Sequence, residues 1–334
     1  MNSRGERPGL PGGQRGIALL VVLWVLTILM VIVFSFSYLA RTETFSSRAF
    51  KEGWENKFLA EAGVERAIME LFYRKQNPLP LEEEGLDPWR TDGTAYIGAL
   101  GKGSYRVRLT DESGKIDLNQ AAEAVLRNLL TNLDFAAEDK ERSVAAIVDA
   151  ILDWKDPDDF HRLNGAENDY YQSLPNPYKA RNGNFETVEE LLLVKGLTPE
   201  ILYGQDRKTG LIDLLTVQGR TNKININAAP PPVLLALPGM TPEMVEGLIA
   251  YRTEREIKNI QEIAGLLGEA LAQISPYISV VGSSVYTIES VGYQRSNQSG
   301  YGIRAKIQIE GDKRYRYLYY KNPVIIKREV EDAE

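Results

Sequence analysis

The chain has 334 residues, a formal net charge of −7, no cysteine and a single histidine, His161. These counts exclude thiol catalysis, thiolate zinc sites and iron–sulfur clusters, and they leave almost no material for a Ser-His pair or a multi-histidine metal site. The acidic balance disfavours a nucleic-acid partner, whose phosphates would be repelled. The length suggests about two domains in addition to any membrane anchor.

The first predicted element is a membrane-spanning helix. Residues 17–40 carry no charged side chain, and a helix of that length extends about 36 Å, enough to cross the hydrocarbon core of a bilayer. Three arginines and one glutamate precede this span, whereas the charges that follow it are closer to balanced. The positive-inside bias therefore predicts a cytoplasmic N-terminus and a body on the other side of the membrane.

The residues around the start of this span predict how it is processed. Gly16 follows Arg15 and directly precedes the apolar run, which resembles a prepilin-type signal, where the leader is removed after the glycine and the helix is retained. A cleaved secretory signal fits less well because the apolar run is too long. A signal-anchor with a chance glycine is the alternative.

The fifth residue after the predicted cleavage point is Val21, where prepilin-like proteins usually carry glutamate. In a helical filament that buried carboxylate would pair with the N-terminal ammonium of a neighbouring subunit, because an unpaired buried charge is costly. A subunit with Val21 cannot offer this pairing. We therefore expect it at one end of an assembly.

Helical periodicity continues beyond the span, with apolar residues at three-to-four spacing over residues 58–73. The pattern predicts one helix from about Ile17 to Arg74. Asn77–Pro80 is expected to end it, and residues 81–94 are expected to form an acidic loop.

Strand signals flank a long helical stretch. Residues 119–282 show helical periods and few strand signals, which predicts a discontinuous α+β domain (41–118 and 283–334) with an all-α inserted domain (119–282). Gly98, Gly101 and Gly103 are expected to supply the first turn. The predicted strands cover residues 94–97, 104–110, 285–292, 302–310 and 314–321, with further turns at 297–300 and 311–312.

The helical stretch contains internal repeats that predict short helix–turn–helix units resembling helix-hairpin-helix or SAM-like folds. Lys115–Ala121 recurs as Lys223–Ala229, and Leu191–Glu200 recurs as Leu234–Glu243. The expected helix N-caps in these units are Asn119, Asn227, Thr198 and Thr241.

Helix-hairpin-helix modules that bind DNA grip a phosphate with backbone N–H groups of a glycine-x-glycine turn. Here threonine replaces the second glycine, at Thr198 and Thr241, and the proline that follows has no N–H to donate. Five glutamates crowd the second unit. We therefore interpret the units as scaffold with no nucleic-acid partner, and DNA binding is the weaker alternative.

Residues 153–171 hold the richest polar cluster, in which Gly165 permits a turn. Oxygen ligands at short spacing suit Ca²⁺, although the pattern is not an EF-hand. The alternative is a solvated acidic loop with helix caps. No nucleophile or histidine partner accompanies the carboxylates, so an enzyme is not expected. The candidate calcium ligands are Asp153, Asp156, Asp158, Asp159, Glu167 and Asp169.

Taken together, these motifs resemble the minor pseudopilin K family of the type II secretion system over essentially the whole chain. No single motif is specific, but their combination and order are. The motifs are Arg15–Leu26, Asp111–Asn119, Asp153–Tyr171, Asn182–Gly196 and Asn225–Arg252.

The resemblance implies a bacterial inner-membrane protein with a leader at 1–16, a transmembrane helix at 17–40 and a periplasmic body. Prepilin peptidase would cut after Gly16 and N-methylate Ile17. The implied fold is a long helix packed on an antiparallel sheet, carrying the SAM-like insert.

The implied function is assembly at the tip of the pseudopilus, which the protein would initiate or cap during protein export. The implied partners are minor pseudopilins I and J, with other pseudopilus and inner-membrane secretion components. Family members bind Ca²⁺ in the soluble domain. A minor pilin of a type IV pilus is the alternative within this class.

Overall fold

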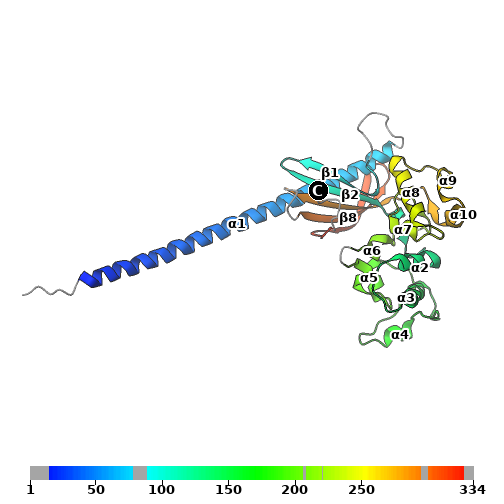
Figure 1. The fold of residues 1–334 in the computed structure, drawn as a ribbon, viewed down its shortest axis with the longest axis horizontal. Coiled ribbons are helices and arrows are strands. Elements are labelled where there is room, and N and C mark those ends of the chain that lie inside the picture. Colours follow the sequence, from blue (N-terminus) through cyan, green and yellow to red (C-terminus); the bar gives the residue numbers. More distant parts are fainter. Residues whose placement is uncertain (1–14, 78–88, 206–207, 220, 295–299, 327–334) are drawn as a thin grey trace, which may run out of the picture. The chain divides into compact units, whose positions relative to one another are not determined.

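A computed structural model describes residues 15–77, 89–205, 208–219, 221–294 and 300–326, with the side chains of residues 15 and 16 left out (Figure 1). Most of the predicted leader 1–16, most of the loop at 81–94 and the turn at 297–300 lie outside these residues, as does Pro78–Pro80 of the expected helix stop. The chain divides into two compact units, Met1–Glu55 and Asn56–Glu334.

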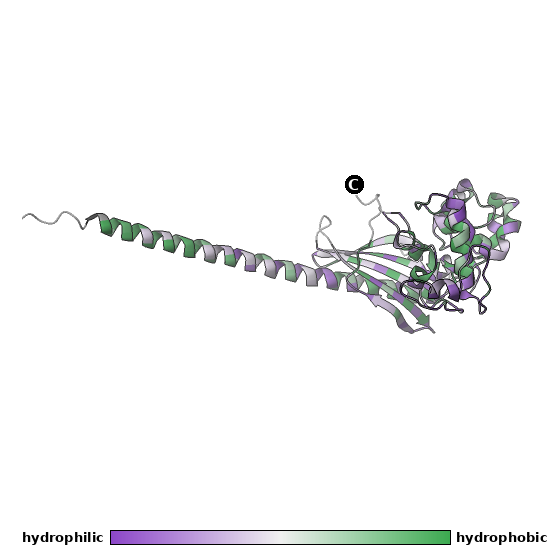
Figure 2. Cartoon of the chain, turned by 90° about the horizontal axis from the view of Figure 1, so that it is seen from below, coloured by the Kyte–Doolittle hydropathy of each residue, from purple (hydrophilic) through white to green (hydrophobic). Residues whose placement is uncertain are grey.

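The first element, α1 (Arg15–Gln76), confirms the predicted long helix to within two residues at each end. Its N-terminal half is apolar and exposed, as Figure 2 shows by the hydrophobic colouring of that part of the helix. Among the described residues, α1 is the one helix long and apolar enough to cross a membrane, with a mean hydropathy of 3.2 in its most apolar part. Exposed apolar surface of this kind is stable in lipid.

In the second unit, the C-terminal part of α1 packs on a five-stranded antiparallel sheet of order β1-β2-β7-β8-β9. Val64, Ile68 and Leu71 of α1 bury against Leu109 and Ile288 of the sheet. The predicted α+β architecture is confirmed. The strands are β1 (Asp92–Leu100), β2 (Gly103–Asp111), β7 (Val285–Tyr293), β8 (Tyr301–Glu310) and β9 (Arg314–Lys321).

One detail of the predicted turn is wrong. Gly98 lies inside β1, opposite Tyr105, and Gly103 begins β2. A Cβ at Gly98 would lie 2.3 Å from the Tyr105 ring, so this glycine makes room for an aromatic side chain. Gly101 alone of the three has a positive φ, +61°, and it forms the turn.

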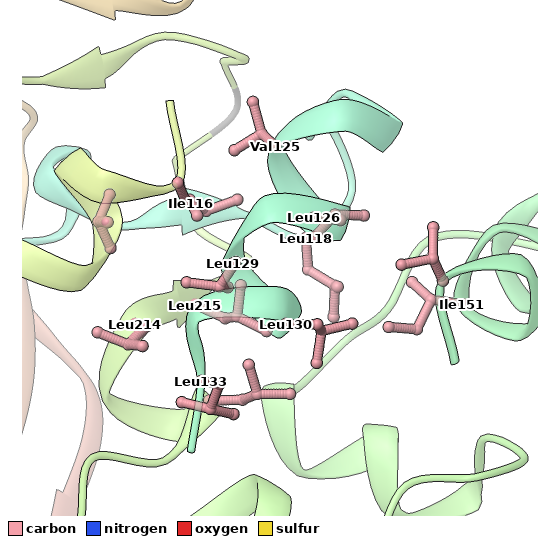
Figure 3. Packing of buried hydrophobic residues seen from close by; sticks show 14 of the residues in the cluster. Ile116, Leu118, Val125, Leu126, Leu129, Leu130, Leu133, Ile151, Leu214 and Leu215 are labelled. Atoms are coloured by element: carbon pink, nitrogen blue, oxygen red, sulfur yellow. The ribbon is translucent and has the colours of Figure 1, made fainter. Parts of the chain in front are cut away.

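Short helices and two-residue strands fill the chain between β2 and β7, around one apolar core. Figure 3 shows the side chains of α2 gathered with Leu118, Ile151 and Leu215. The elements are η1 (Glu112–Gly114), β3 (Ile116–Asp117), α2 (Glu123–Asn132), α3 (Lys140–Lys155), α4 (Asn168–Gln172), η2 (Val188–Leu193), α5 (Pro199–Tyr203), α6 (Leu211–Leu214), β4 (Leu215–Thr216), β5 (Ile224–Asn225), α7 (Pro231–Leu235), α8 (Pro242–Glu254), η3 (Ile260–Ile263), α9 (Ala264–Leu267), α10 (Ala270–Ile274), η4 (Ser275–Tyr277) and β6 (Ile278–Ser279).

These elements form two copies of one frame, the first repeat (residues 115–216) and the second repeat (residues 223–279). Each repeat begins with a two-residue strand that pairs in parallel with the strand that ends it, β3 with β4 and β5 with β6. Parallel pairing of the ends closes each repeat on itself. The Lys-Ile-x-x-Asn motif, which occurs twice in the sequence, thus marks the first strand of each closing pair.

The prediction that Asn119 and Asn227 are helix N-caps is wrong. The helices begin at Glu123 and Pro231, with other residues at the N-cap. Each asparagine instead pairs both ways with a distant backbone: Asn119 accepts from Phe185 N and donates to Phe185 O. Asn227 does the same with Ile257. A side-chain amide carries both a donor and an acceptor, so it can replace a strand partner.

The threonine caps are confirmed. Thr198 Oγ1 accepts from Ile201 N at 3.4 Å, and Thr241 Oγ1 accepts from Met244 N at 3.3 Å. In both cases the proline after the threonine occupies the first helical position, where its missing N–H costs nothing. The N-termini of α5 and α8 are therefore each capped by a side chain of their own repeat.

A buried carboxylate, Glu112, joins the sheet to the first repeat. It accepts from Thr287 of β7 at 2.7 Å and from Thr216 of β4 at 2.6 Å. It also forms ion pairs with Lys115 and Lys306, each at 2.9 Å. Burial alone would raise the Glu112 pKa, but the two ammonium groups outweigh it and hold that pKa well below its usual range.

Candidate metal centre

The two repeats differ most after their central helix. Lys155 of α3 donates to Leu118 O and Asn119 O, and Arg252 of α8 donates to Ile226 O and Ala229 O, so the two cations occupy equivalent positions. In the first repeat, residues 156–184 connect Lys155 to Phe185, whose backbone pairs with Asn119. In the second repeat, only residues 253–256 connect Arg252 to Ile257, whose backbone pairs with Asn227. Residues 156–184 are thus an insertion in the first repeat.

The insertion brings three carboxylates together. Asp156, Asp158 and Glu167 each offer one oxygen, and these oxygens lie within 4.8 Å of one another. Glu167 is 1 % exposed, and neither of its carboxylate oxygens has a hydrogen-bond partner. Oδ1 of Asp156 is likewise buried and unpartnered. Because a buried charge without a partner is costly, this arrangement needs a cation or protons.

The titration of these carboxylates reflects the same crowding. Burial, together with the nearby charges of Asp153 and Asp156, raises the pKa of Glu167 to about 7. Burial and the charge of Asp158 also raise the pKa of Asp156. The site without a cation therefore takes up protons near neutral pH, and a cation would compete with them.

Asp153 has a different role from these three carboxylates. Its side chain is fully buried, and its Oδ2 accepts from Ala166 N at 3.0 Å and Arg162 N at 3.2 Å. A Cβ at Gly165 would lie 1.8 Å from the same oxygen, so the loop must have glycine there. Asp153 thus folds the loop that carries Glu167.

Asp159 and Asp169 lie outside the group of three. Asp159 Oδ1 accepts from the side-chain amides of Asn168 at 2.7 Å and Asn182 at 3.1 Å. The Asp169 side chain is 70 % exposed, and its Oδ1 lies 3.1 Å from His161 Nε2. His161 therefore contacts a carboxylate on the surface.

Sequence reasoning missed Asn182 as a site residue. Its Nδ2 donates to Asp158 O and Asp159 Oδ1, and its Oδ1 is buried without a partner. Among the described non-glycine residues it alone has a positive φ, of 47°. The signal in the sequence is the Asn182-Gly183 pair, because asparagine is among the few residues that tolerate this conformation. Asn182 thus contacts the backbone of Asp158 and carries a buried, unpartnered neutral oxygen in the same insertion.

The donor set is chemically uniform. Three carboxylates and a side-chain amide oxygen are hard ligands of the type that Ca²⁺ takes, usually six to eight oxygens including water and backbone carbonyls. Nitrogen and sulfur donors, which zinc and copper prefer, are absent among Asp156, Asp158, Glu167 and Asn182. The residues present thus fit a hard divalent cation.

The predicted processing residues all lie in α1, which begins at Arg15. Gly16 and Ile17 are in the first helical turn, and Val21 is 54 % exposed. No carboxylate lies near Val21 within the helix, since residues 17–40 are uncharged. Cleavage after Gly16 and methylation of Ile17 stay predictions.

Comparison with known proteins gives matches along most of the chain. The family models described as "Type II secretion system (T2SS), protein K" match residues 107–204 and 224–280. Type II secretion system protein K of Pseudomonas aeruginosa is 24% identical over 314 residues, covering 89% of this chain and 88% of the relative. The chain belongs to the type II secretion system protein K family. Family membership, with α1, identifies a membrane-anchored pseudopilin of that machinery.

Further matches agree with this assignment. The Aeromonas hydrophila protein K is 29% identical over 208 residues, covering 56% of this chain and 60% of the relative. A chain in the crystal structure of the GspK-GspI-GspJ complex from enterotoxigenic Escherichia coli aligns with a TM-score of 0.59 at 18% identity, over 83% of this chain and 99% of that chain. This likeness shows the shared fold. The two family models fall on the two repeats, with the insertion inside the first.

Proposed function

We propose that this protein is the minor pseudopilin at the tip of the type II secretion pseudopilus, where it initiates or caps assembly. The observation that carries the proposal is Val21, an uncharged residue where a filament subunit needs a carboxylate. The partners proposed are minor pseudopilins I and J, because a structural relative was crystallised in complex with GspI and GspJ. The role is structural, with no catalytic chemistry.

The proposed mechanism follows from electrostatics within the bilayer. A subunit whose fifth mature residue is glutamate can neutralise the ammonium of a neighbour, and an unpaired charge there is expensive. With Val21, this chain offers its own N-terminal ammonium but no carboxylate in return. It can therefore pair with a neighbouring subunit through its ammonium only, and a subunit that pairs on one side only lies at an end of the assembly.

The orientation and processing belong to the same proposal. The N-terminus lies in the cytoplasm, the span crosses the inner membrane and the rest is periplasmic, as the arginines before the span favour. Prepilin peptidase removes residues 1–16 and methylates Ile17. Residues 41–118 and 283–334 form the pseudopilin domain, and residues 119–282 form the inserted domain.

The test moves a carboxylate by one position. In cells that lack the native copy, Val21→Glu is expected to enter the body of the pseudopilus, so that immunogold label runs along the filament. Wild type and Val22→Glu, the matched control with the same added charge, are expected at one end. If Val21→Glu stays at one end, or if wild type labels the whole length, the tip assignment is wrong.

We further propose that Asp156, Asp158 and Glu167, with Asn182, hold Ca²⁺. The support is the pair of unpartnered Glu167 oxygens in a buried position. Bound Ca²⁺ would supply two positive charges among the carboxylates. The residues of the chain then fix the loop, since Asp153 holds the backbone on both sides of Gly165.

Calorimetry on the detergent-solubilised full chain tests the calcium site. Wild type and Asp169→Asn, an exposed acidic control in the same segment, are expected to bind one Ca²⁺ with similar affinity. Glu167→Gln keeps the side-chain size but removes the buried charge, and it is expected to weaken binding at least tenfold. No binding heat in wild type, or equal affinity for Glu167→Gln, would refute the site.

A further inference from the structure

Two of the most exposed apolar side chains in the second unit lie on the insertion. Leu163 is 96 % exposed and Phe160 is 82 % exposed, three residues apart between the predicted metal ligands Asp158 and Glu167. A single exposed apolar residue is ordinary on a protein surface. Two large ones on the same short loop need a further explanation.

The loop holds these side chains outward in a fixed backbone. On one side of Leu163, the N–H of Arg162 donates to buried Asp153, and on the other, the N–H of Asn164 donates to buried Asp149. The N–H of Phe160 donates to Asp158 at 2.9 Å. Because the backbone is anchored on each side, the loop cannot fold over to cover Leu163. Pre-ordering of this kind lowers the entropy cost of binding a partner.

The comparison of the two repeats shows that this loop is an addition. The second repeat closes through Asn227 and Ile257 with only residues 253–256 in the equivalent position. The frame therefore forms without an insertion. Exposed apolar residues on a segment that the frame does not require are more readily explained by binding than by folding.

The charge around Phe160 and Leu163 selects the kind of partner. Residues 156–169 carry five carboxylates and one arginine. With one divalent cation bound, two negative charges are left. An anionic membrane surface would be repelled by this charge, whereas a protein surface with lysine or arginine around an apolar pocket would be attracted.

We propose that Phe160 and Leu163 are a docking contact for a folded protein partner that presents an apolar pocket bordered by basic side chains. This inference goes beyond the tip assignment and does not require that the segment bind calcium. Phe160 supplies an aromatic anchor, and Leu163 supplies a second apolar contact on the same loop. Aromatic anchors in pockets carry most of the energy at many interfaces.

Photo-crosslinking of the full chain in secreting cells tests this proposal. A benzophenone amino acid at position 163 is expected to link one protein, through a peptide that has apolar residues close to lysine or arginine. The same probe at Val281, which is 71 % exposed and lies outside the insertion, is the matched control and is expected to give no such adduct. Adducts with lipid only, equal adducts from both positions, or an acidic linked peptide would overturn the proposal.

A second substitution in the probe-bearing chain separates docking from folding and from calcium binding. Phe160→Ser is expected to lower the yield of the adduct at least fivefold, and Phe160→Tyr is expected to retain it. Calcium affinity should be unchanged in both variants, since the Phe160 side chain is not a ligand. An unchanged yield with Phe160→Ser would contradict the proposal. Loss of calcium binding in Glu167→Gln would leave it intact.

Discussion

The first and second repeats have the same closing interactions and different connecting segments. Trp154 Nε1 donates to Glu190 in the first repeat, as Tyr251 Oη donates to Glu262 in the second. The paired backbone hydrogen bonds of Asn119 and of Asn227, here called the asparagine clamps, also correspond. Only the first repeat inserts a long acidic segment between these shared features. The shared frame is complete without the acidic segment, and the unpartnered carboxylate oxygens lie in the segment that only the first repeat has.

If the two frames are equivalent, Arg252 and Lys155 should contribute equally to the stability of their repeats. Arg252→Met leaves the carbonyls of Ile226 and Ala229 without their charged donor, and Lys155→Met does the same to those of Leu118 and Asn119. Each change is expected to cost about 3 kcal/mol of local stability. Amide hydrogen exchange in peptides of each repeat measures the cost. A large loss of stability in one repeat and none in the other would contradict the equivalence of the two frames.

The asparagine clamps should give a smaller, matched effect. Asn119→Ala and Asn227→Ala each remove two hydrogen bonds to a distant backbone, and we expect about 2 kcal/mol of local destabilisation in each repeat. Asn→Asp keeps the acceptor and loses the donor, so it should fall between wild type and alanine. Hydrogen exchange at residues 185 and 257 reports each clamp directly. Protection unchanged by alanine would contradict the equivalence.

A pH effect should separate the repeats. The pKa of Glu167 in the folded chain, about 7, lies above its ordinary value of 4.5. Folding without calcium therefore takes up a proton between these values, and the stability of the first repeat should fall as pH rises from about 4.5 to about 7. The second repeat has no equivalent carboxylate.

Hydrogen exchange at pH 5 and pH 7.5 in a calcium chelator, corrected for the intrinsic exchange rates, tests this difference. Glu167→Gln should reduce the pH dependence of the first repeat, and the second repeat serves as the control within the same chain. Added Ca²⁺ should restore stability at the higher pH by pairing with the ionised carboxylates. If the first repeat became more stable between pH 5 and pH 7.5 without calcium, the raised pKa of Glu167 would be contradicted.

The smallest effect is expected at the exposed pair. His161 Nε2 contacts Asp169 Oδ1 on the surface, and exposed charge pairs contribute about 0–1 kcal/mol. His161→Ala should change neither the local stability of the first repeat nor its calcium affinity beyond a factor of about two. A tenfold loss of calcium affinity would show that this pair supports the metal centre and would enlarge the site.

Elements with a local signal could be predicted from the sequence alone. The uncharged run at residues 17–40 specifies a lipid-compatible helix, and the alternation over residues 314–321 specifies β9. Both signals are contained in a short stretch of consecutive residues. The caps at Thr198 and Thr241 depend on residues three positions away and were predicted for the same reason.

The packing of distant segments sets which polar side chains hold the backbone and which have no hydrogen-bond partner. Asp153 and Glu167 belong to one acidic run, yet Asp153 receives backbone N–H groups while Glu167 receives none. Asn119 has the sequence of a cap but pairs with Phe185, 66 residues away. Hydrogen bonds between distant segments are set by how the helices pack around the core, and no local period records them. For that reason the fold was predictable in outline and the site only as a region.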